Sequence, residues 1–455
     1  MTGMFESLPL EQLIGKSFPC ECGKTHTMTL KYLKIERGAL KYVPEALRTV
    51  GGSHPAVVFD KNTYEAAGKR VCAILDEAGI AYQPILLPGE GRIEPDERAV
   101  GSVVMALDPA CDTLIAVGSG VINDVVKVTS RATGKPNIIV GTAPSMDGFA
   151  SNSSSMIVNR VKTTLYNHCP HAIVLDTEVL AAAPMRMIRS GLGDMVAKAI
   201  AVCEWRISKI VTGEYYCEHV AQLMRNALDG ILAVAEQLPE RDPDAIGKVA
   251  EGLVLSGIAM AYAQVSRPAS GLEHYFSHMW EMMALLRGGE SDFHGIQVGV
   301  GSLITLRIYD KLLTETPDRE KSEAVSASFD EAKWRENIGR VFGKCAGEIF
   351  RIEEKAGKNK NETREKHFER IAENWDEIKT IIREELACAG RIREVMEKTG
   401  LPLKPSEIGV ENGDVSDAFI CSRDLRDKYL TSSMLWDMGL LETYEHSDLF
   451  SDEKL

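Results

Sequence analysis

The sequence predicts an α/β domain built on a parallel sheet, followed by a domain that is entirely helical, with the change near residue 180. Before residue 180, short apolar segments alternate with helical patterns, which is the arrangement of consecutive βαβ units. After about Thr177, apolar residues recur at helical spacing and strand-like alternation does not return. We therefore expect residues 1–180 to form the α/β domain and residues 181–455 to form the helical domain.

The expected strands of the first domain are short, apolar and bounded by glycine or aspartate, which is typical of a sheet buried on both faces. They are expected at residues 56–59, 82–87, 113–117, 137–140 and 172–175. Helices are expected between them at 63–78, 96–108 and 121–133. In the second domain, long helical patterns occur at 215–238, 245–264 and 294–313. The Lys- and Glu-rich stretch 353–385 predicts a solvated helical hairpin, and the tail from Glu411 onward contains an amphipathic helix pattern.

Composition excludes several classes of protein. The 52 Lys and Arg against 66 Asp and Glu give a net charge of −14, which argues against nucleic acid as the main partner. No segment reaches the roughly 18 uninterrupted apolar residues of a membrane helix, since the longest, 252–263, ends at Gln264. The N-terminus lacks the basic start and apolar stretch of a signal peptide, and ten cysteines are too sparse for a disulfide scaffold. We expect a cytoplasmic protein with reduced thiols and no membrane insertion.

A glycine turn, Gly118-Ser119-Gly120, follows the expected strand at 113–117 and precedes a helix. Glycine lets the backbone approach a phosphate closely, and a helix N-terminus offers N–H groups and a positive dipole end to an anion. The third glycine of the usual dinucleotide fingerprint is missing, so a tight strand-to-helix turn without a ligand is the alternative. Asp124 lies in the first turns of this helix, where a carboxylate also suits the dipole without any ligand.

Small and hydroxyl-bearing residues fill the segment 141–153, which follows the expected strand at 137–140. They leave room for a ligand and supply hydrogen-bond donors. In a parallel sheet this position is the carboxyl edge, where ligands bind. A polar loop without a ligand is the alternative.

One carboxylate and three imidazoles are distinctive in the helical half. Asp194 lies in a small, apolar stretch, and His274 and His278 are four residues apart, so they share one face of a helix. His294 precedes a further long helix. One carboxylate with two imidazoles suits zinc, nickel or iron(II), with an open position for a substrate oxygen. A single histidine is more often a core residue, but three of the ten histidines within this window favour a shared site.

A Cys-x-Cys pair near the N-terminus, Cys20 and Cys22, is followed by His26. This pattern invites a zinc interpretation. A zinc site of this kind needs four ligands, and four are not available in this segment. A β-hairpin turn with inert thiols is therefore favoured.

Taken together, these motifs resemble the sn-glycerol-1-phosphate dehydrogenases, most closely their bacterial branch. The wider superfamily holds iron-containing alcohol dehydrogenases, glycerol dehydrogenase and 3-dehydroquinate synthase. The matching blocks are GSGVINDVVK, GTAPSMDGFAS, SGLGDMVAK, SRPASGLEHYFSHMWE and FHGIQVGVG, with CECGKTH near the start and RDLRDKYL near the end. The resemblance spans most of the chain except residues 353–385. It implies a dehydroquinate synthase-like fold, in which a nucleotide-binding α/β domain and a helical domain hold a metal in the cleft between them.

The resemblance also implies roles for particular residues. NAD or NADP is expected on Gly118, Ser119 and Gly120, with Asp124 nearby, and the loop facing nicotinamide and substrate maps onto Thr142, Ser145, Asp147 and Ser151. One divalent metal is expected on Asp194, His274 and His294. Lys198 stands where the iron-dependent relatives carry a further histidine ligand, which favours zinc or nickel over iron. Asp147 and His278 are the candidate catalytic residues for proton transfer.

The activity that the resemblance implies is the reversible reduction of dihydroxyacetone phosphate to sn-glycerol 1-phosphate. The substrate is then a small phosphorylated three-carbon compound, whose phosphate needs cationic or N–H donors such as Lys162, Lys198 or Arg267. Three alternatives stay open: a glycerol dehydrogenase acting on the free polyol, a lyase like 3-dehydroquinate synthase, and an inactive binding protein on the same fold. The C-terminal helix pattern permits a homodimer without requiring one.

Overall fold

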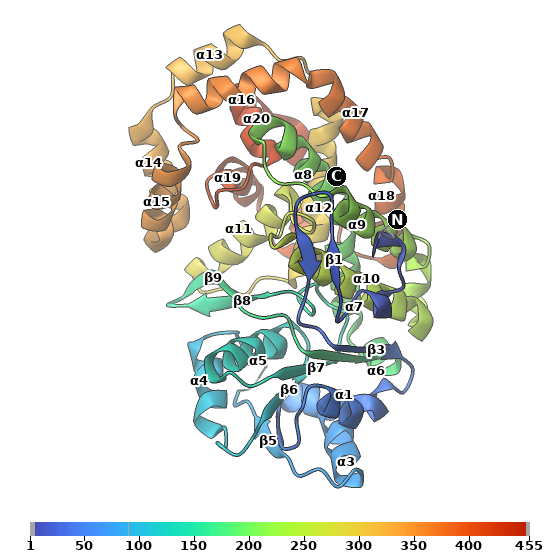
Figure 1. The fold of residues 1–455 in the computed structure, drawn as a ribbon. Coiled ribbons are helices and arrows are strands. Elements are labelled where there is room, and N and C mark those ends of the chain that lie inside the picture. Colours follow the sequence, from blue (N-terminus) through green and yellow to red (C-terminus); the bar gives the residue numbers. More distant parts are fainter. Residues whose placement is uncertain (1–4, 90, 452–455) are drawn as a thin grey trace. The chain divides into compact units, whose positions relative to one another are not determined.

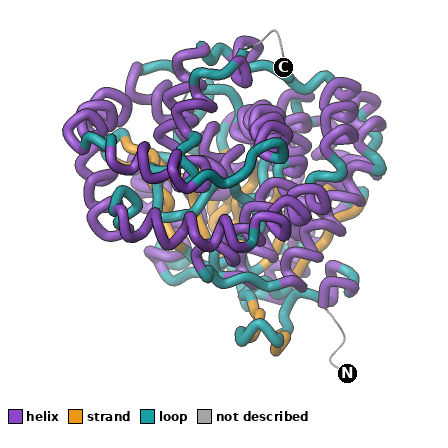
Figure 2. The backbone as a smooth tube through the Cα atoms, turned by 90° about the horizontal axis from the view of Figure 1, so that it is seen from above, coloured by secondary structure: helices purple, strands orange, loops and turns teal. Residues whose placement is uncertain are grey.

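The computed structural model describes residues 5–89 and 91–451, which form two compact units (Figure 1). Unit 1 comprises Met1–Met195 and Cys217–Pro268, and unit 2 comprises Val196–Tyr216 and Ala269–Leu455. Helix is the predominant element of the described chain (Figure 2). The predicted fold class, a parallel sheet followed by helices, is confirmed. The boundary predicted at residue 180 lies shortly after β10 (Ala172–Asp176), the last strand among the described residues, whereas unit 1 continues to Met195 and also includes Cys217–Pro268.

Unit 1 is organised around a six-stranded parallel sheet. Besides β10, its strands are β3 (Tyr32–Glu36), β4 (Pro55–Phe59), β5 (Gln83–Leu86), β6 (Thr113–Gly118) and β7 (Asn137–Gly141). The spatial order is β3-β10-β7-β6-β4-β5, so all five predicted strands are present and β3 is an addition at one edge. The order of connection reverses between β4 and β6. The carboxyl end of β6 therefore lies at the switch point, where such sheets bind ligands.

Helices cover both faces of this sheet (Figure 1), which explains why its strands are apolar throughout. On one face, α1 (Val43–Thr49) and α3 (Lys69–Glu77) pack against side chains such as Val57. On the other face, α4 (Glu97–Ala106) and α5 (Gly120–Thr133) pack against side chains such as Val58. Because successive side chains of a strand point to opposite faces, each strand supplies both cores.

Two antiparallel hairpins accompany the sheet in unit 1. The first pairs β1 (Ser17–Pro19) with β2 (Thr25–Thr27), and it confirms the hairpin turn expected at the Cys-x-Cys motif. The second pairs β8 (Ser153–Val158) with β9 (Val161–Tyr166). Sequence patterns miss this second hairpin because its strands are rich in serine and threonine and are only partly buried.

The remaining α-helices of unit 1 are the short α2 (Lys61–Thr63), α6 (Thr177–Ala182), α7 (Met185–Val196), α9 (Glu218–Leu232) and α10 (Pro243–Ala263). Among the described residues, α10 is the one helix long and apolar enough to cross a membrane. Of its most apolar window, 83% is buried within the protein, so α10 is a core helix.

Unit 2 is helical. Its helices are α8 (Lys198–Thr212), α11 (Leu272–Arg287), α12 (His294–Leu312), α13 (Arg319–Ala327), α14 (Glu331–Phe342), α15 (Ala346–Ala356), α16 (Asn361–Glu373), α17 (Trp375–Glu385), α18 (Ala389–Thr399), α19 (Asn412–Ser422), α20 (Thr431–Asp437) and α21 (Leu441–Glu445). The charged stretch predicted as a solvated hairpin forms α16 and α17, which bury one apolar face each, including Phe368 and Trp375. They pack beside α8 in unit 2.

The tail departs from a continuous amphipathic helix between α19 and α20. The buried Lys358 ammonium donates hydrogen bonds to the backbone carbonyls of Arg423, Arg426 and Lys428. The segment 423–430 is a loop, and three of its carbonyls turn toward this ammonium. Burial lowers the pKa of Lys358 to about 8.

Candidate active site

The glycine turn joins β6 to α5 at the carboxyl edge of the sheet. Ser119 is the N-terminal cap of α5, and Gly120 is the first residue of the helix. A Cβ atom on Gly118 would lie 2.5 Å from the Cβ of Ile122, a separation that real Cβ atoms essentially never show. Packing alone therefore requires glycine at position 118. The binding of a pyrophosphate at this turn stays a prediction.

The loop between β7 and β8 carries Thr142, Ser145 and Ser151, and all three side chains are buried. The loop packs against two helices at points where only glycine fits. A Cβ on Gly191 in α7 would lie 1.8 Å from the carbonyl oxygen of Pro144. A Cβ on Gly257 in α10 would lie 2.8 Å from the Cβ of Ala150. Gly191, the first glycine of the SGLGD motif, thus allows the loop to reach Asp194.

A buried lysine in α5, Lys127, anchors the end of this loop. Its ammonium donates hydrogen bonds to the carbonyl oxygens of Gly148, at 3.0 Å, and of Ser153. It also lies 3.2 Å from the Asp124 carboxylate, whose other oxygen accepts the Ser155 N–H at 3.1 Å. Asp124, expected near the cofactor, therefore binds the backbone of the β8–β9 hairpin. Sequence patterns do not single out the anchoring role of Lys127.

Asp147 and Asp194, two acidic residues of unit 1, are joined by a hydrogen bond. The backbone N–H of Asp147 donates to Oδ2 of the buried Asp194 at 2.9 Å. The Asp147 carboxylate accepts a hydrogen bond from the Ser256 hydroxyl at 2.7 Å. Ser256 is missed by sequence reasoning, although a buried hydroxyl within the apolar helix α10 is the signal that marks it.

In unit 2, α11 carries His274 and His278, and α12 begins at His294. The ring centroid of His294 lies 5.4 Å from that of each of the other two. The Nδ1 atom of His274 is 2.8 Å from Oε1 of the buried Glu273. An Nδ1–H that donates to this carboxylate leaves Nε2 of His274 as a metal ligand.

Glu281 is a second acidic residue of unit 2 that sequence reasoning missed. His278, Glu281 and His294 offer ligand atoms that all lie within 4.8 Å of one another. The Glu281 carboxylate is 3.4 Å from Nδ1 of His294 and 3.8 Å from Nδ1 of His278. Its position three residues after His278, on the same helix face, is the signal that could have identified it.

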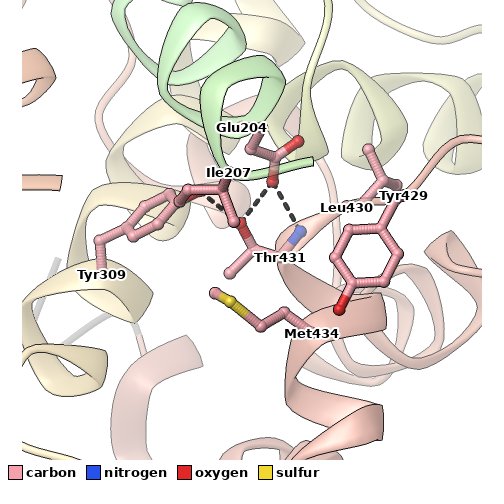
Figure 3. A pocket seen from close by; sticks show the side chains of 7 residues that line it. All are labelled: Glu204, Ile207, Tyr309, Tyr429, Leu430, Thr431 and Met434. Carbon is pink, nitrogen blue, oxygen red and sulfur yellow. Dashed lines mark hydrogen bonds between the residues drawn. The ribbon is translucent and has the colours of Figure 1, made fainter. Parts of the chain in front are cut away.

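A buried carboxylate in α8 holds the start of α11. Glu204 accepts hydrogen bonds from the backbone N–H groups of Leu272, at 3.0 Å, and Thr431, at 2.8 Å. The Thr431 hydroxyl lies between Glu204 and the phenol of Tyr309 (Figure 3), 2.6 Å from the phenol oxygen. Burial raises the pKa of Tyr309 well above its usual value, so the phenol stays protonated. This network fixes the helix two residues before His274.

The structure also locates the other residues considered for ligands. Lys198 is buried in α8 and donates to the carbonyl of Ala269 at 3.1 Å. Arg267 is buried in unit 1, and Lys162 lies on β9. The binding of a substrate phosphate by any of the three stays a prediction.

Comparison with known proteins agrees with this fold. The model of the family described as iron-containing alcohol dehydrogenase matches residues 34–184. The chain is 35% identical to a glycerol-1-phosphate dehydrogenase (NAD(P)+) of Halalkalibacterium halodurans over 303 residues, covering 66% of this chain and 76% of that protein. It is 30% identical to the enzyme of that name from Geobacillus stearothermophilus, covering 92% and 94%.

A crystal structure of glycerol dehydrogenase from Schizosaccharomyces pombe superposes on this chain with a TM-score of 0.60 and 15% sequence identity. The superposition covers 91% of this chain and 90% of that one, so the two proteins share a fold. The family match relates residues 34–184 to the iron-containing alcohol dehydrogenases, and the solved structure shares the fold. By its similarity to the two enzymes named above, the chain belongs to the glycerol-1-phosphate dehydrogenase family.

Proposed function

We propose that this protein reduces dihydroxyacetone phosphate to sn-glycerol 1-phosphate, using NADH or NADPH as the hydride donor and one divalent metal. The observation that carries the proposal is the family membership, with relatives of that activity name at 30–35% identity. The buried, oriented imidazole of His274 in unit 2 supports it, because a histidine held in one tautomer is suited to metal binding.

The proposed metal ligands are Asp194, His274 and His294. Their donor set, one carboxylate oxygen and two imidazole nitrogens, suits zinc or nickel. A bound divalent metal polarises a ketone and stabilises negative charge on its oxygen. Glu273 orients His274, and the N–H of Asp147 occupies one oxygen of Asp194. These two partners would set which atoms face the metal.

The proposed dinucleotide site uses Gly118, Ser119 and Gly120 at the start of α5, where an anion is favoured by the helix N-terminus. Thr142, Ser145 and Ser151 belong to the loop proposed to face nicotinamide and substrate. Lys127 donates a hydrogen bond to this loop, and Asp124, paired with Lys127, accepts one from the β8–β9 hairpin.

His278 and Asp147 are the proposed proton-transfer residues. Hydride addition to the substrate's central carbon leaves a proton to be supplied to the adjacent oxygen. His278, beside the Glu281 carboxylate at 3.8 Å, is suited to hold that proton as an imidazolium. The Asp147 carboxylate, which accepts the Ser256 hydroxyl, would orient the relay.

A hydride-transfer assay tests the proposal. We expect NADH or NADPH oxidation with dihydroxyacetone phosphate and much slower oxidation with dihydroxyacetone. Equal rates on both would favour a glycerol dehydrogenase, and released inorganic phosphate would favour a lyase. The absence of bound metal and nucleotide at saturation would favour an inactive binding protein.

Variants test the ligand assignment. Asp194→Ala and His274→Ala are each expected to lose one bound metal and the activity while keeping their circular dichroism spectrum. His446→Ala is the matched control, because this histidine is 77% exposed at the end of α21. Glu281→Gln distinguishes the alternative set of His278, Glu281 and His294. Metal loss in Glu281→Gln with retention in Asp194→Ala would replace the first set by the second.

We also propose that the enzyme acts in the cytoplasm without membrane insertion. The burial of α10 in the described core supports the second of these points. A homodimer is compatible with the proposal. Sedimentation of the purified protein measures its oligomeric state, and cell fractionation measures its location.

A further inference from the structure

Three cysteines and one histidine converge in unit 1, and none of them belongs to the site proposed above. Cys20, Cys22 and His26 belong to the β1–β2 hairpin, and the fourth group, Cys217, is nearly 200 residues further along the chain. Their ligand atoms all lie within 4.8 Å of one another. The sequence suggested inert thiols because a fourth ligand was missing from the hairpin, and the tertiary fold supplies it.

Three of the six distances between the four ligand atoms are those of a tetrahedral metal site. The Sγ atoms of Cys20 and Cys217 are 3.7 Å apart, and Nε2 of His26 lies 3.5 Å from Sγ of Cys22 and 3.6 Å from Sγ of Cys217. Zinc bonds of about 2.3 Å to sulfur and about 2.0–2.1 Å to nitrogen at tetrahedral angles separate two sulfurs by about 3.8 Å. The same geometry separates sulfur from nitrogen by about 3.5 Å. A disulfide would need about 2.05 Å between sulfurs.

His26 is held in the tautomer that a metal requires. Its side chain is fully buried, and its Nδ1 lies 2.9 Å from the carbonyl oxygen of Tyr262. An Nδ1–H donating to this carbonyl leaves the lone pair of Nε2 directed at the thiols. The ring also packs against Phe5 and Tyr262, with centroids 5.1 and 5.5 Å away, so its orientation is fixed by packing as well.

The backbone that carries Cys20 and Cys22 forms a tight turn. The turn is closed by hydrogen bonds from the N–H of Cys20 to Lys24 and from the N–H of Gly23 to Cys20. Gly23 has φ of +86°, a left-handed conformation that favours glycine. Cys217 is the N-terminal cap of α9, so the start of that helix fixes the position of the thiol beside the hairpin.

We infer that Cys20, Cys22, His26 and Cys217 bind a structural zinc ion that is distinct from the proposed catalytic metal. Four protein ligands close the coordination sphere, so this zinc has no open position for a substrate. It would tie the N-terminal hairpin to the start of α9, where the chain enters unit 1 again after Tyr216. Its loss is expected to lower stability before it affects hydride transfer.

Metal analysis of the full-length protein, purified after growth with zinc, tests this inference. We expect one tightly held zinc, additional to any metal at the proposed catalytic site, that disappears in Cys22→Ser and Cys217→Ser and stays in His274→Ala. Cys388→Ser is the matched control, because Cys388 is partly exposed like Cys22 but lies outside the cluster. Retention of all bound zinc in both Cys22→Ser and Cys217→Ser would overturn the inference.

Two measurements on the unmodified protein avoid dependence on folding of the variants. Cobalt(II) substitution should give a near-ultraviolet sulfur-to-cobalt charge-transfer band, which a site of carboxylate and imidazoles cannot produce. Zinc X-ray absorption should show sulfur neighbours at about 2.3 Å. A metal environment without sulfur, or a Cys20–Cys217 disulfide in non-reducing peptide mapping, would refute the site. Neither result depends on the proposed dehydrogenase activity.

Discussion

The close contact between α7 and the loop after β7 yields a sharp prediction, Gly191→Ala. The added Cβ would lie 1.8 Å from the Pro144 carbonyl oxygen, whereas real Cβ atoms essentially never come closer than 3.0 Å. The loop or the helix must therefore move by at least about 1.2 Å. The atom that the Cβ would meet belongs to the Pro144 backbone, so no flexible side chain can absorb the movement.

Two consequences follow from that displacement. Overpacking of a tight interior costs about 1–3 kcal/mol of unfolding free energy, which lowers the thermal midpoint by about 2–4 °C for each kcal/mol. Pro144 is three residues before Asp147, whose N–H donates to Asp194 at 2.9 Å. Because Asp194 is a proposed metal ligand, and a shift of about 1 Å at a reacting group costs about a hundredfold in rate, we expect a loss of that order in kcat/KM.

Differential scanning fluorimetry and the hydride-transfer assay measure the two effects. Gly230→Ala is the matched control, because Gly230 also lies in a helix, α9, but a Cβ there meets no atom within 4 Å. Since alanine is the better helix former by up to about 1 kcal/mol, this control should be neutral or slightly stabilising. Equal midpoints and rates for the two variants would refute the reasoning about the loop.

Three further predictions concern buried polar groups. Lys127→Met should lower the free energy of unfolding in urea by about 3–5 kcal/mol, because it leaves the Asp124 carboxylate and two loop carbonyls without their cation. A decrease below about 1 kcal/mol would contradict this. Glu204→Gln should cost about 1–3 kcal/mol and weaken metal binding at the proposed ligand His274, since the amide cannot accept all the bonds that start α11. Unchanged metal affinity in equilibrium dialysis would argue against that link. Burial lowers the pKa of His171, whose Nδ1 accepts the Asn137 N–H at 3.3 Å, so the stability that the neutral ring contributes is present above pH 6.5 and is lost as the pH falls below that value. The unfolding free energy of His171→Gln should therefore depend less on acid pH than that of the parent. An identical pH dependence would contradict the assignment.

Local patterns were sufficient to predict the sheet and most long helices. The strands β4, β6, β7 and β10 are continuous apolar runs, because a parallel sheet with helices on both faces buries every side chain. The hairpin β8–β9 and the short edge strand β3 carry too many polar or half-exposed residues to show such a pattern. Their pairing depends on neighbours that are remote in the sequence.

The sequence by itself determined the fold class, the glycine turn after β6 and the types of residue that a metal and a dinucleotide need. It could not determine which side chains meet, because contacts across tens or hundreds of residues are set by packing. The contact of Gly191 with Pro144, the Glu273 partner of His274 and the arrival of Cys217 at the Cys-x-Cys hairpin were decided by the tertiary structure alone. In each case the sequence gives the identity of the two groups, and only the tertiary structure gives the distance between them.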